Sequence, residues 1–367
     1  MENQNEFNLD SRYQFVRYLG KGAYGIVGEF IDTKTGAKVA IKKIPLASGH
    51  LESIQEHVID AKKILREIII MYYFKHNNII NLRHVMARQE GKCIWLFLVL
   101  DLMDADLRKA IKNSELTDGH IQYIMYQIFL GLQYLHSGNV IHRDIKPNNI
   151  LVNEECRVAL CDFGFAREAE GMENMMTEYV VTRIYRAPEI VLCPKNYTKA
   201  VDIWAIGCTL YELMSRTVLF NAQNYKELII MVIKTLGSPK DEEMEFITRT
   251  SAKTFIKSLP YFPPMKPSAK LPNYPNPKAL DLLDRCLTFD PNKRISAEEA
   301  LRHSYFENLF HESHIQKFNH TIDFSFEFDE NIDMTRLLRL IYDYLNLINQ
   351  HAAEPLIPSE IFNVTWL

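Results

Sequence analysis

The chain has 367 residues, of which 47% are hydrophobic and 24% charged, and its formal net charge is −4. Single hydrophobic cores stop growing at roughly 250–300 residues, so this length predicts two lobes and not one small core. The small net charge excludes a general attraction to nucleic acid or to a membrane surface, so any phosphate site must be local.

Three further patterns restrict the class of protein. The six cysteines form no Cys-x-x-Cys or Cys/His cluster, which argues against a zinc site and a disulfide framework and favours reduced thiols. Residues 1–10 are polar and acidic, so we expect no signal peptide. The longest apolar run, from Cys93 to Leu100, is too short to span a bilayer.

The N-terminal part of the sequence is rich in strands. Short runs of β-branched and aromatic residues, separated by glycine-rich turns, predict strands at Tyr13 to Leu19, Gly25 to Asp32 and Lys38 to Lys43. A helical pattern follows from Leu51 to Phe74, and Cys93 to Leu100 is a predicted buried strand.

From Leu107 onward the patterns are mostly helical. Helices are predicted at Ile121–His136, Val201–Met214, Leu228–Leu236, Leu280–Leu287 and Ala297–His303. Residues 257–277 are rich in proline and are predicted to form a loop. Strands followed by helices predict an α+β fold of two lobes, and a cleft between lobes is a natural place for a ligand.

A glycine-rich segment, Gly20-Lys21-Gly22-Ala23-Tyr24-Gly25, lies between the first two predicted strands. A single G-x-G-x-x-G is weak evidence, because glycines also serve ordinary turns. Its place between two strands, and not between a strand and a helix, disfavours a dinucleotide-binding unit. It fits a hairpin whose backbone can close over phosphates.

Lys42 ends the apolar strand Val39-Ala40-Ile41-Lys42. A lysine there would bury its stem and aim its ammonium inward, which is costly without an anion or a carboxylate as partner. Glu67 on the following helix can supply that carboxylate. Taken alone, the tetrapeptide would favour a surface lysine at a strand edge.

The densest polar cluster is His142-Arg143-Asp144-Ile145-Lys146-Pro147-Asn148-Asn149, followed after an apolar strand by Asp162-Phe163-Gly164. Phosphoryl transfer needs a carboxylate that accepts the hydroxyl proton, cations near the moving charge, and oxygen ligands for Mg²⁺. Asp144 is the predicted base, and Lys146 is predicted to offset charge on the γ-phosphate. Asn149 and Asp162 are the predicted metal ligands.

These motifs occur in the order seen in protein kinases, and residues 13–310 resemble a eukaryotic protein kinase domain. The resemblance implies a bilobal α+β fold with a β-rich N-lobe and a helical C-lobe, and it implies ATP and Mg²⁺ as cofactors. It also implies that Asp202 begins a central anchoring helix and that Arg294 pairs with Glu189 of Ala187-Pro188-Glu189. The implied ATP contacts are Leu19, Gly20, Gly22, Gly25, Val27, Ala40, Lys42, Leu100, Asp101, Met103, Asp106, Asn149, Leu151 and Asp162.

Within that resemblance each group of contacts has an implied role. Asp101 and Met103 would offer backbone groups to the adenine, and Leu100 would be the gatekeeper. Val27, Ala40 and Leu151 would enclose the adenine ring, although plain core packing explains such apolar residues equally well.

Thr177-Glu178-Tyr179, between the Asp-Phe-Gly and Ala-Pro-Glu tripeptides, resembles the extracellular-signal-regulated branch of the mitogen-activated protein kinases. This likeness implies a proline-directed serine/threonine kinase that is activated by phosphorylation of both Thr177 and Tyr179. The alternatives are an enzyme like the cyclin-dependent kinases, a nucleotide-binding pseudokinase scaffold, and a small-molecule kinase of similar fold. The complete set of catalytic residues disfavours the pseudokinase.

The resemblance also implies a physical switch. A phosphate adds about −1.5 to −2 charge and three acceptor oxygens, which arginines can bind. Phospho-Thr177 would gather Arg66, Arg143 and Arg167, and phospho-Tyr179 would meet Arg183 and Arg186. Thr182 is implied to support catalysis by hydrogen bonding to Asp144 and Lys146.

The predicted domains are an N-terminal tail (1–12), an N-lobe (13–103) with a hinge at about 100–104, a C-lobe (104–310) with an insert at about 221–277, and a C-terminal extension (311–367) that packs back on the N-lobe. Expected partners are protein substrates with Ser/Thr-Pro sites, phosphatases, and an upstream dual-specificity kinase unless the chain phosphorylates itself. We expect a monomer of the cytoplasm and nucleus that binds neither nucleic acid nor membrane.

The sequence departs from the family pattern in the segment that carries Thr177 and Tyr179 and in the expected docking patch. The segment from Asp162 to Thr177 is a few residues short, and Ile184 stands where the family usually has tryptophan. The acidic docking patch expected after Phe306 offers only Glu312, so basic partner peptides would bind weakly or use other acids such as Asp323.

Overall fold

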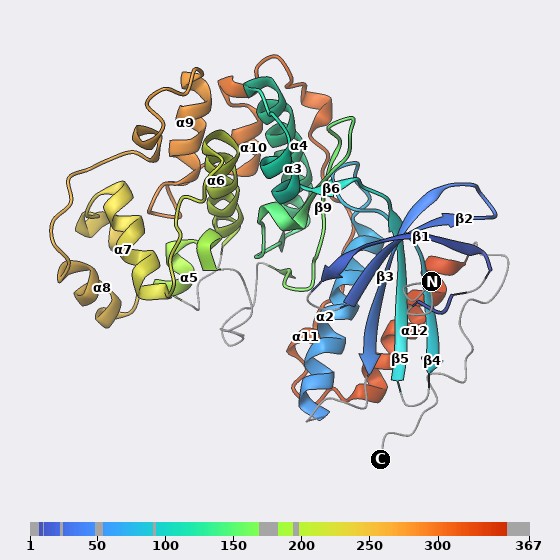
Figure 1. Ribbon diagram of the computed structural model, residues 1–367. Helices are drawn as coiled ribbons and strands as arrows, with labels where there is room; N and C mark the ends of the chain where they lie inside the picture. Colours follow the sequence, from blue (N-terminus) through green and yellow to red (C-terminus); the bar gives the residue numbers. More distant parts are fainter. Residues whose placement is uncertain are drawn as a thin grey trace. The chain divides into compact units, whose positions relative to one another are not determined.

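The computed structural model describes residues 7–9, 11–22, 25–47, 54–90, 93–168, 183–193 and 198–350. The chain forms two compact units, one of Met1–Met103 with His320–Leu367 and the other of Asp104–Asn319 (Figure 1). In the described part, no helix is long and apolar enough to cross a bilayer.

The first unit is built on a five-stranded antiparallel sheet. Its strands are β1 (Tyr13–Gly22), β2 (Gly25–Asp32), β3 (Lys38–Ala47), β4 (Leu82–Glu90) and β5 (Cys93–Asp101), in the order β1-β2-β3-β5-β4. Side chains alternate between the two faces of a strand. Val39 and Ile41 of β3 therefore join an aromatic cluster on one face, whereas Lys42 points to the other face.

Phe7, which lies in the predicted N-terminal tail (1–12), is buried against the sheet. Its side chain is 1% exposed and packs edge-on against Phe30, with the ring centroids 5.1 Å apart. A Cβ added at Gly28 would lie only 3.0 Å from the Phe7 ring. Residues 7–9 therefore help to complete the core of the sheet.

Two helices from opposite ends of the chain lie side by side in this unit, α2 (Ile54–Tyr73) and α12 (Met334–Asn349), drawn in blue and orange-red in Figure 1. A short helix, α11 (Ser325–Phe328), precedes α12. Leu337, Ile341 and Leu345 are fully buried at helical spacing, so α12 presents one continuous apolar face to its neighbours.

The second unit is mainly helical. Its helices are α3 (Leu107–Asn113), α4 (Asp118–Ser137), α5 (Pro188–Leu192), α6 (Ala200–Ser215), α7 (Tyr225–Leu236), α8 (Thr250–Lys257), α9 (Pro277–Cys286) and α10 (Ala297–Leu301). Its short strands are β6 (Ala105–Asp106), β7 (Val140–Ile141), β8 (Ile150–Val152), β9 (Val158–Leu160) and β10 (Arg167–Glu168). Residues 201–213 of α6 are all buried, so this helix is the centre of the unit.

Helix ends differ from the predicted ones mainly where a polar residue caps the helix. Helix α7 begins at Tyr225, three residues before the predicted start, because the side chain of Asn224 accepts a hydrogen bond from the backbone N–H of Glu227. Helix α9 likewise begins at Pro277 after the cap Asn276. Strand β4 and helix α8 were not predicted.

Candidate active site

The first unit supplies the glycine-rich hairpin and one ion pair. Within the described residues, a Cβ added at Gly20 would meet no heavy atom within 4 Å, whereas one at Gly25 would lie 1.9 Å from the carbonyl oxygen of Lys43. Gly25 is therefore required by the close approach of β3. Gly20 is the glycine that leaves open space, as phosphate binding by the backbone requires.

Lys42 and Glu67 form the predicted ion pair. The Lys42 Nζ atom lies 2.7 Å and 3.1 Å from the two carboxylate oxygens of Glu67, and the two side chains are 13% and 7% exposed. Because Lys42 is on the sheet and Glu67 is on α2, the pair ties helix to sheet. It also holds the ammonium in one place, which a phosphate-binding lysine needs.

The predicted adenine-binding residues of this unit lie on neighbouring strands. Ala40 of β3 pairs with Leu100 of β5, and Val27 of β2 pairs with Lys42. Met103 is mostly buried, and the side chain of Asp101 pairs with Arg83. The register therefore brings Val27, Ala40 and Leu100 to adjoining strands, while their contact with adenine stays a prediction.

Arg66 is already engaged in this unit. Its Nη2 and Nε atoms lie 2.5 Å and 2.6 Å from Oε1 of Glu327, and the two side chains are 1% and 4% exposed. Lys62, one turn earlier on α2, donates to the backbone carbonyls of Glu327 and Asp329. Arg66 therefore already has a counter-ion, Glu327, in the absence of a phosphate. Sequence reasoning missed Glu327 because it lies 261 residues away in the chain.

The second unit holds the predicted catalytic residues together. Lys146 Nζ lies 2.7 Å from Oδ2 of Asp144, and the Asn149 amide nitrogen donates to the same oxygen and to the Asp144 carbonyl, both at 2.8 Å. Asp144 is 5% exposed and Asn149 is 6% exposed. A carboxylate held by two donors is oriented before any substrate arrives.

Asp202, the first acidic residue of α6, anchors this catalytic loop. Its carboxylate accepts hydrogen bonds from the backbone N–H groups of His142 and Arg143, both at 2.8 Å, and from the His136 ring at 2.9 Å. Burial by itself disfavours the carboxylate, but these donors outweigh it and the pKa of Asp202 lies below its usual value. Asp202 therefore holds Arg143 in a left-handed backbone conformation at φ 68°.

Asp162 has features that suit a cation ligand. Its backbone is left-handed at φ 65°, and within the described residues its Oδ1 atom is buried with no hydrogen-bond partner. The Asn149 amide nitrogen is occupied by Asp144, which leaves its oxygen as the available ligand. Hard oxygen donors of this kind fit Mg²⁺. The described residues contain no cluster of three His, Cys, Asp or Glu ligands, so a metal here would need further oxygens from the nucleotide or water.

Asp106 and Leu151, the predicted ATP contacts of this unit, are paired across strands β6 and β8. The Asp106 side chain also accepts a hydrogen bond from the backbone N–H of Lys109 at 2.9 Å and so caps α3. Its carboxylate is thereby fixed at the first turn of that helix.

Comparison with known proteins decides the family. Residues 13–306 match the model described as "Protein kinase domain". A tobacco protein (Nicotiana tabacum) named mitogen-activated protein kinase homolog NTF3 is 44% identical over 84% of this chain and 81% of its own length. Mitogen-activated protein kinase 14 of Arabidopsis thaliana is 40% identical over 93% of this chain and 91% of its own. Extracellular signal-regulated kinase 1 of Dictyostelium discoideum is 40% identical over 96% and 65%.

The chain belongs to the mitogen-activated protein kinase family. It is a protein serine/threonine kinase, and the resemblance predicted from its sequence is confirmed. The bilobal protein kinase fold is confirmed as well.

Asp144 is the predicted base of this mitogen-activated protein kinase, and its surroundings affect its proton affinity. Burial raises the pKa of the Asp144 carboxyl above its usual value, and the charge and hydrogen bond of Lys146 oppose that rise. Only the ionised carboxylate can accept a proton. Activity should therefore fall on the acid side as the pH drops through this raised pKa.

Lys146→Gln is expected to move the acidic limb of the kcat/KM profile to higher pH by about one unit, because it removes the charge that lowers the Asp144 pKa. The measurement is a pH–rate profile on a peptide substrate. Lys146→Arg keeps the charge and should leave the limb near its wild-type position. A limb that stays in place in the Gln variant would mean that it does not report Asp144.

Glu189 and Arg294 form the predicted ion pair of the second unit. The distances are 2.6 Å and 3.1 Å, and the side chains are 1% and 0% exposed. The guanidinium also donates to the carbonyl of Ala200 and lies 5.1 Å from the Trp204 ring centroid. Arg294 thus links Glu189 of α5 to Ala200 at the start of the central helix α6.

Arg294→Met is expected to reduce the free energy of unfolding by about 3–5 kcal/mol, because it leaves the Glu189 carboxylate buried without its counter-ion. Chemical denaturation followed by fluorescence would measure the change. Arg285→Met is the matched control, since the Arg285–Asp281 pair is roughly half exposed and should contribute much less. Equal losses in both variants would contradict the assignment.

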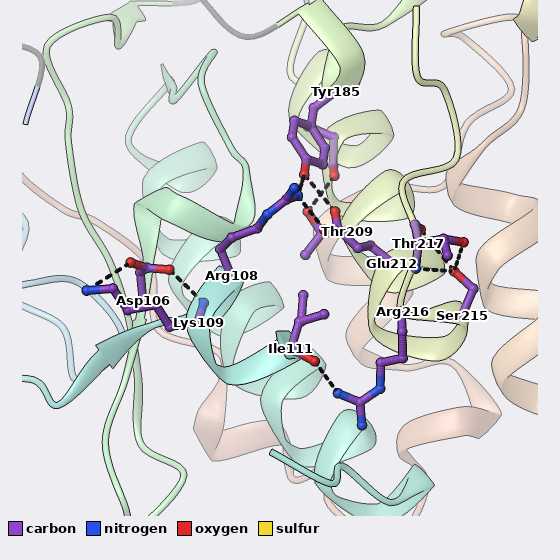
Figure 2. Close-up of polar contacts among 11 residues, drawn as sticks. Asp106, Arg108, Lys109, Ile111, Tyr185, Thr209, Glu212, Ser215, Arg216 and Thr217 are labelled. Carbon is purple, nitrogen blue, oxygen red and sulfur yellow. Dashed lines mark hydrogen bonds and ion pairs between the residues drawn. The ribbon is translucent and has the colours of Figure 1, made fainter. Parts of the chain in front are cut away.

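A further, partly buried cluster was not predicted from the sequence. Figure 2 shows Arg108 of α3 and Tyr185 both turned toward Glu212 of α6. Arg108 Nη1 lies 2.6 Å from Oε1 of Glu212, and the Tyr185 hydroxyl donates to Oε2 at 2.6 Å. Burial, with help from Glu212, raises the pKa of Tyr185, so the hydroxyl remains a donor. A single glutamate in the apolar run of α6 was the available signal.

This cluster fixes the segment that follows the predicted phospho-acceptors. Tyr185 is held to α6, and Arg216 at the end of α6 donates to the carbonyls of Ile111 and Ser114, which holds α3 to the same helix (Figure 2). Thr177, Tyr179 and Thr182 lie outside the described residues.

The phosphate-binding arginines of the second unit are only partly brought together. Arg167 of β10 pairs with Ile141 of β7, two residues before Arg143, so Arg143 and Arg167 lie on neighbouring segments. Arg183 and Arg186 lie together on a different part of this unit, at Tyr225 of α7.

The two acids predicted for a docking patch both have hydrogen-bond partners within the chain. Glu312, the one acid expected there, accepts two hydrogen bonds from the guanidinium of Arg302. Asp323, the suggested substitute, accepts a hydrogen bond from the backbone N–H of Ser325. Both carboxylates are therefore engaged within the chain.

Proposed function

We propose that this kinase uses Mg·ATP to phosphorylate protein serine or threonine residues that precede proline, and that phosphorylation of both Thr177 and Tyr179 switches it on. The observation that carries the proposal is the buried Asp144 carboxylate, held by Lys146 and Asn149 at 2.7 Å and 2.8 Å. A carboxylate, a cation and a side-chain amide lie next to one another there, and this grouping supports a role in phosphoryl transfer.

In this proposal each residue has one task. Asp144 accepts the proton of the substrate hydroxyl, and Lys146 stabilises negative charge on the group being transferred. The oxygens of Asn149 and Asp162 hold the metal ion, and Lys42, positioned by Glu67, contacts the nucleotide phosphates. Bound Mg·ATP supplies the phosphoryl group and the charge that neutralises it.

The proposed switch uses arginines as phosphate ligands. Phospho-Thr177 binds Arg143 and Arg167, and their neighbouring positions support this. Arg66, which the resemblance also implies, is already paired with Glu327. Phospho-Tyr179 binds Arg183 and Arg186. Thr182 hydrogen bonds to Asp144 and Lys146 and so supports the catalytic loop.

The partners follow from the family. The relatives are named mitogen-activated and extracellular signal-regulated kinases, so we propose that this chain also acts on protein substrates within a signalling sequence. Either an upstream dual-specificity kinase or the chain itself modifies Thr177 and Tyr179, and phosphatases reverse the change. We propose a monomer that works in the cytoplasm and nucleus.

One experiment tests the core of the proposal. Bacterially made protein is incubated with Mg·ATP, with and without an activating dual-specificity kinase, and phosphates on Thr177 and Tyr179 are mapped by mass spectrometry. Activity is then measured on paired peptides with Ser-Pro or Ser-Ala. We expect activity to follow double phosphorylation and to favour Ser-Pro. Equal use of both peptides would overturn the proline preference, and activity independent of phosphate would overturn the switch.

A further inference from the structure

The second unit contains an open pocket that none of the described catalytic or ATP-contact residues lines. Its volume is about 700 Å³, which is within the range of roughly 300–1,000 Å³ typical of small-molecule sites. Helix α4 packs against both α6 and α10 (Figure 1), and the pocket is lined by the end of α4, the start of α6 and residues of the segment 291–298. We call it the α4–α6 pocket.

Gln133 is the reason to expect a ligand in this pocket. It lines the pocket and is 4% exposed, and within the described residues its buried Oε1 atom has no hydrogen-bond partner. Gln127 on the same helix shows the usual arrangement, since its amide donates to the carbonyl of Cys156 at 2.7 Å and accepts from the backbone N–H of Val158 at 3.0 Å. Buried polar groups nearly always have such partners. A molecule in the α4–α6 pocket would supply the partner that Gln133 Oε1 lacks.

The charges around the pocket favour an anion. Lys199 and Lys317 both line it and add positive charge. Arg294 and Glu298 line it as well, but each is paired with an opposite charge of the same unit. The potential that a ligand meets is therefore positive.

We propose that the α4–α6 pocket binds a small amphipathic organic anion that carries an N–H or O–H group. Its apolar body packs on Ile203 and Ile295, and its acid group lies near Lys199 and Lys317. The N–H or O–H group hydrogen bonds to the amide of Gln133. A half-turn of that amide about its last side-chain bond exchanges its oxygen and nitrogen, so a ligand in the pocket can reach either atom.

The test uses two fluorescent probes on the full chain, with the nucleotide site filled by excess Mg·ADP. The first, 8-anilinonaphthalene-1-sulfonate, has the apolar rings, the N–H and the acid group that the proposal requires. The second, N-phenyl-1-naphthylamine, is the same molecule without the sulfonate. Fluorescence titration should show saturable binding of one sulfonate probe per chain and weaker binding of the neutral probe. Absence of saturable binding would overturn the proposal.

Asn292→Trp tests where the probes bind. Asn292 is an exposed residue that lines the pocket, so a tryptophan there should fill part of the pocket without disturbing the core. Both probes should then lose their binding. Binding that persists at the wild-type level would place the probes elsewhere and overturn the site.

Gln133→Met tests the amide, because methionine has a similar length and no hydrogen-bonding amide. Both probes should bind about 3- to 10-fold more weakly, since each loses the same hydrogen bond. The unfolding temperature without probe should not fall, because no buried polar atom is left unpaired. Gln316→Met, at an exposed residue that does not line the pocket, is the matched control and should change neither quantity. Unchanged probe affinity in Gln133→Met, or a marked loss of stability without probe, would overturn the role of Gln133.

The double variant Lys199→Gln with Lys317→Gln tests the preference for an anion. The sulfonate probe should bind about 3- to 10-fold more weakly, whereas the neutral probe should change little. Lys112→Gln with Lys270→Gln removes the same total charge at exposed lysines that do not line the pocket, and it should leave both affinities unchanged. Equal weakening of the two probes in the first double variant would overturn the anion preference.

Discussion

Asp144→Asn is expected to lower turnover by roughly 10²–10⁴-fold, because the amide cannot accept the proton of the substrate hydroxyl. Asparagine has the same shape, and Lys146 and Asn149 can still hydrogen bond to its side-chain oxygen, so the loop should keep its conformation. The affinity for ATP, measured by calorimetry or nucleotide fluorescence, should change little. Turnover is measured by transfer of labelled phosphate to a Ser-Pro peptide.

Glu154→Gln is the matched control for this change from acid to amide. Glu154 is exposed and lies in the same unit, so its replacement should leave turnover unchanged. A residual rate in Asp144→Asn equal to that of Glu154→Gln would contradict the assignment of the base. Wild-type protein that binds nucleotide but transfers no phosphate after activation would favour the pseudokinase alternative.

Thr177→Ala combined with Tyr179→Phe is expected to depress turnover by orders of magnitude while leaving ATP binding largely intact. Neither phosphate could then recruit its arginines, so the catalytic loop and the substrate-binding segment would lose their activated arrangement. The assay compares the double variant with wild type after both have been treated with the activating kinase.

The two single variants are expected to change different kinetic constants. Thr177→Ala should mainly lower kcat, because Arg143 and Arg167 border the catalytic loop, whereas Tyr179→Phe should mainly raise the KM for the peptide. Thr198→Ala with Tyr261→Phe is the control, since both side chains are exposed and belong to the same unit. Equal turnover of the double variant and the doubly phosphorylated wild type would reject the switch.

The clustering of the predicted catalytic side chains could be foreseen because they lie in one short contiguous segment. Asp144, Lys146 and Asn149 lie within six residues, and local backbone geometry is enough to bring their side chains together. The Lys42–Glu67 pair was predictable for a related reason. A strand followed by a helix brings one face of each into contact, and a buried lysine needs a carboxylate there.

The remaining contacts were not predictable because each depends on how distant segments pack. Glu327 reaches Arg66 only after α11 and α12 fold onto α2, and Arg108 meets Glu212 only because α3 lies along α6. No local pattern encodes either pairing. Strand β4 escaped prediction because its alternation is interrupted: Val85, Met86 and Ala87 are all buried.

The C-terminal segment has a consequence for how the chain is made. The match to the kinase family ends at residue 306, yet the unit that carries Lys42 and Glu67 also contains residues from His320 onward. Asn349 exchanges two hydrogen bonds with the backbone of Val85, and Glu327 neutralises Arg66. During synthesis these residues leave the ribosome after the whole of the other unit. The unit that carries Lys42 and Glu67 therefore finishes folding only after Asp104–Asn319 has emerged, and the surroundings of Asp144 can form before those of Lys42 are complete.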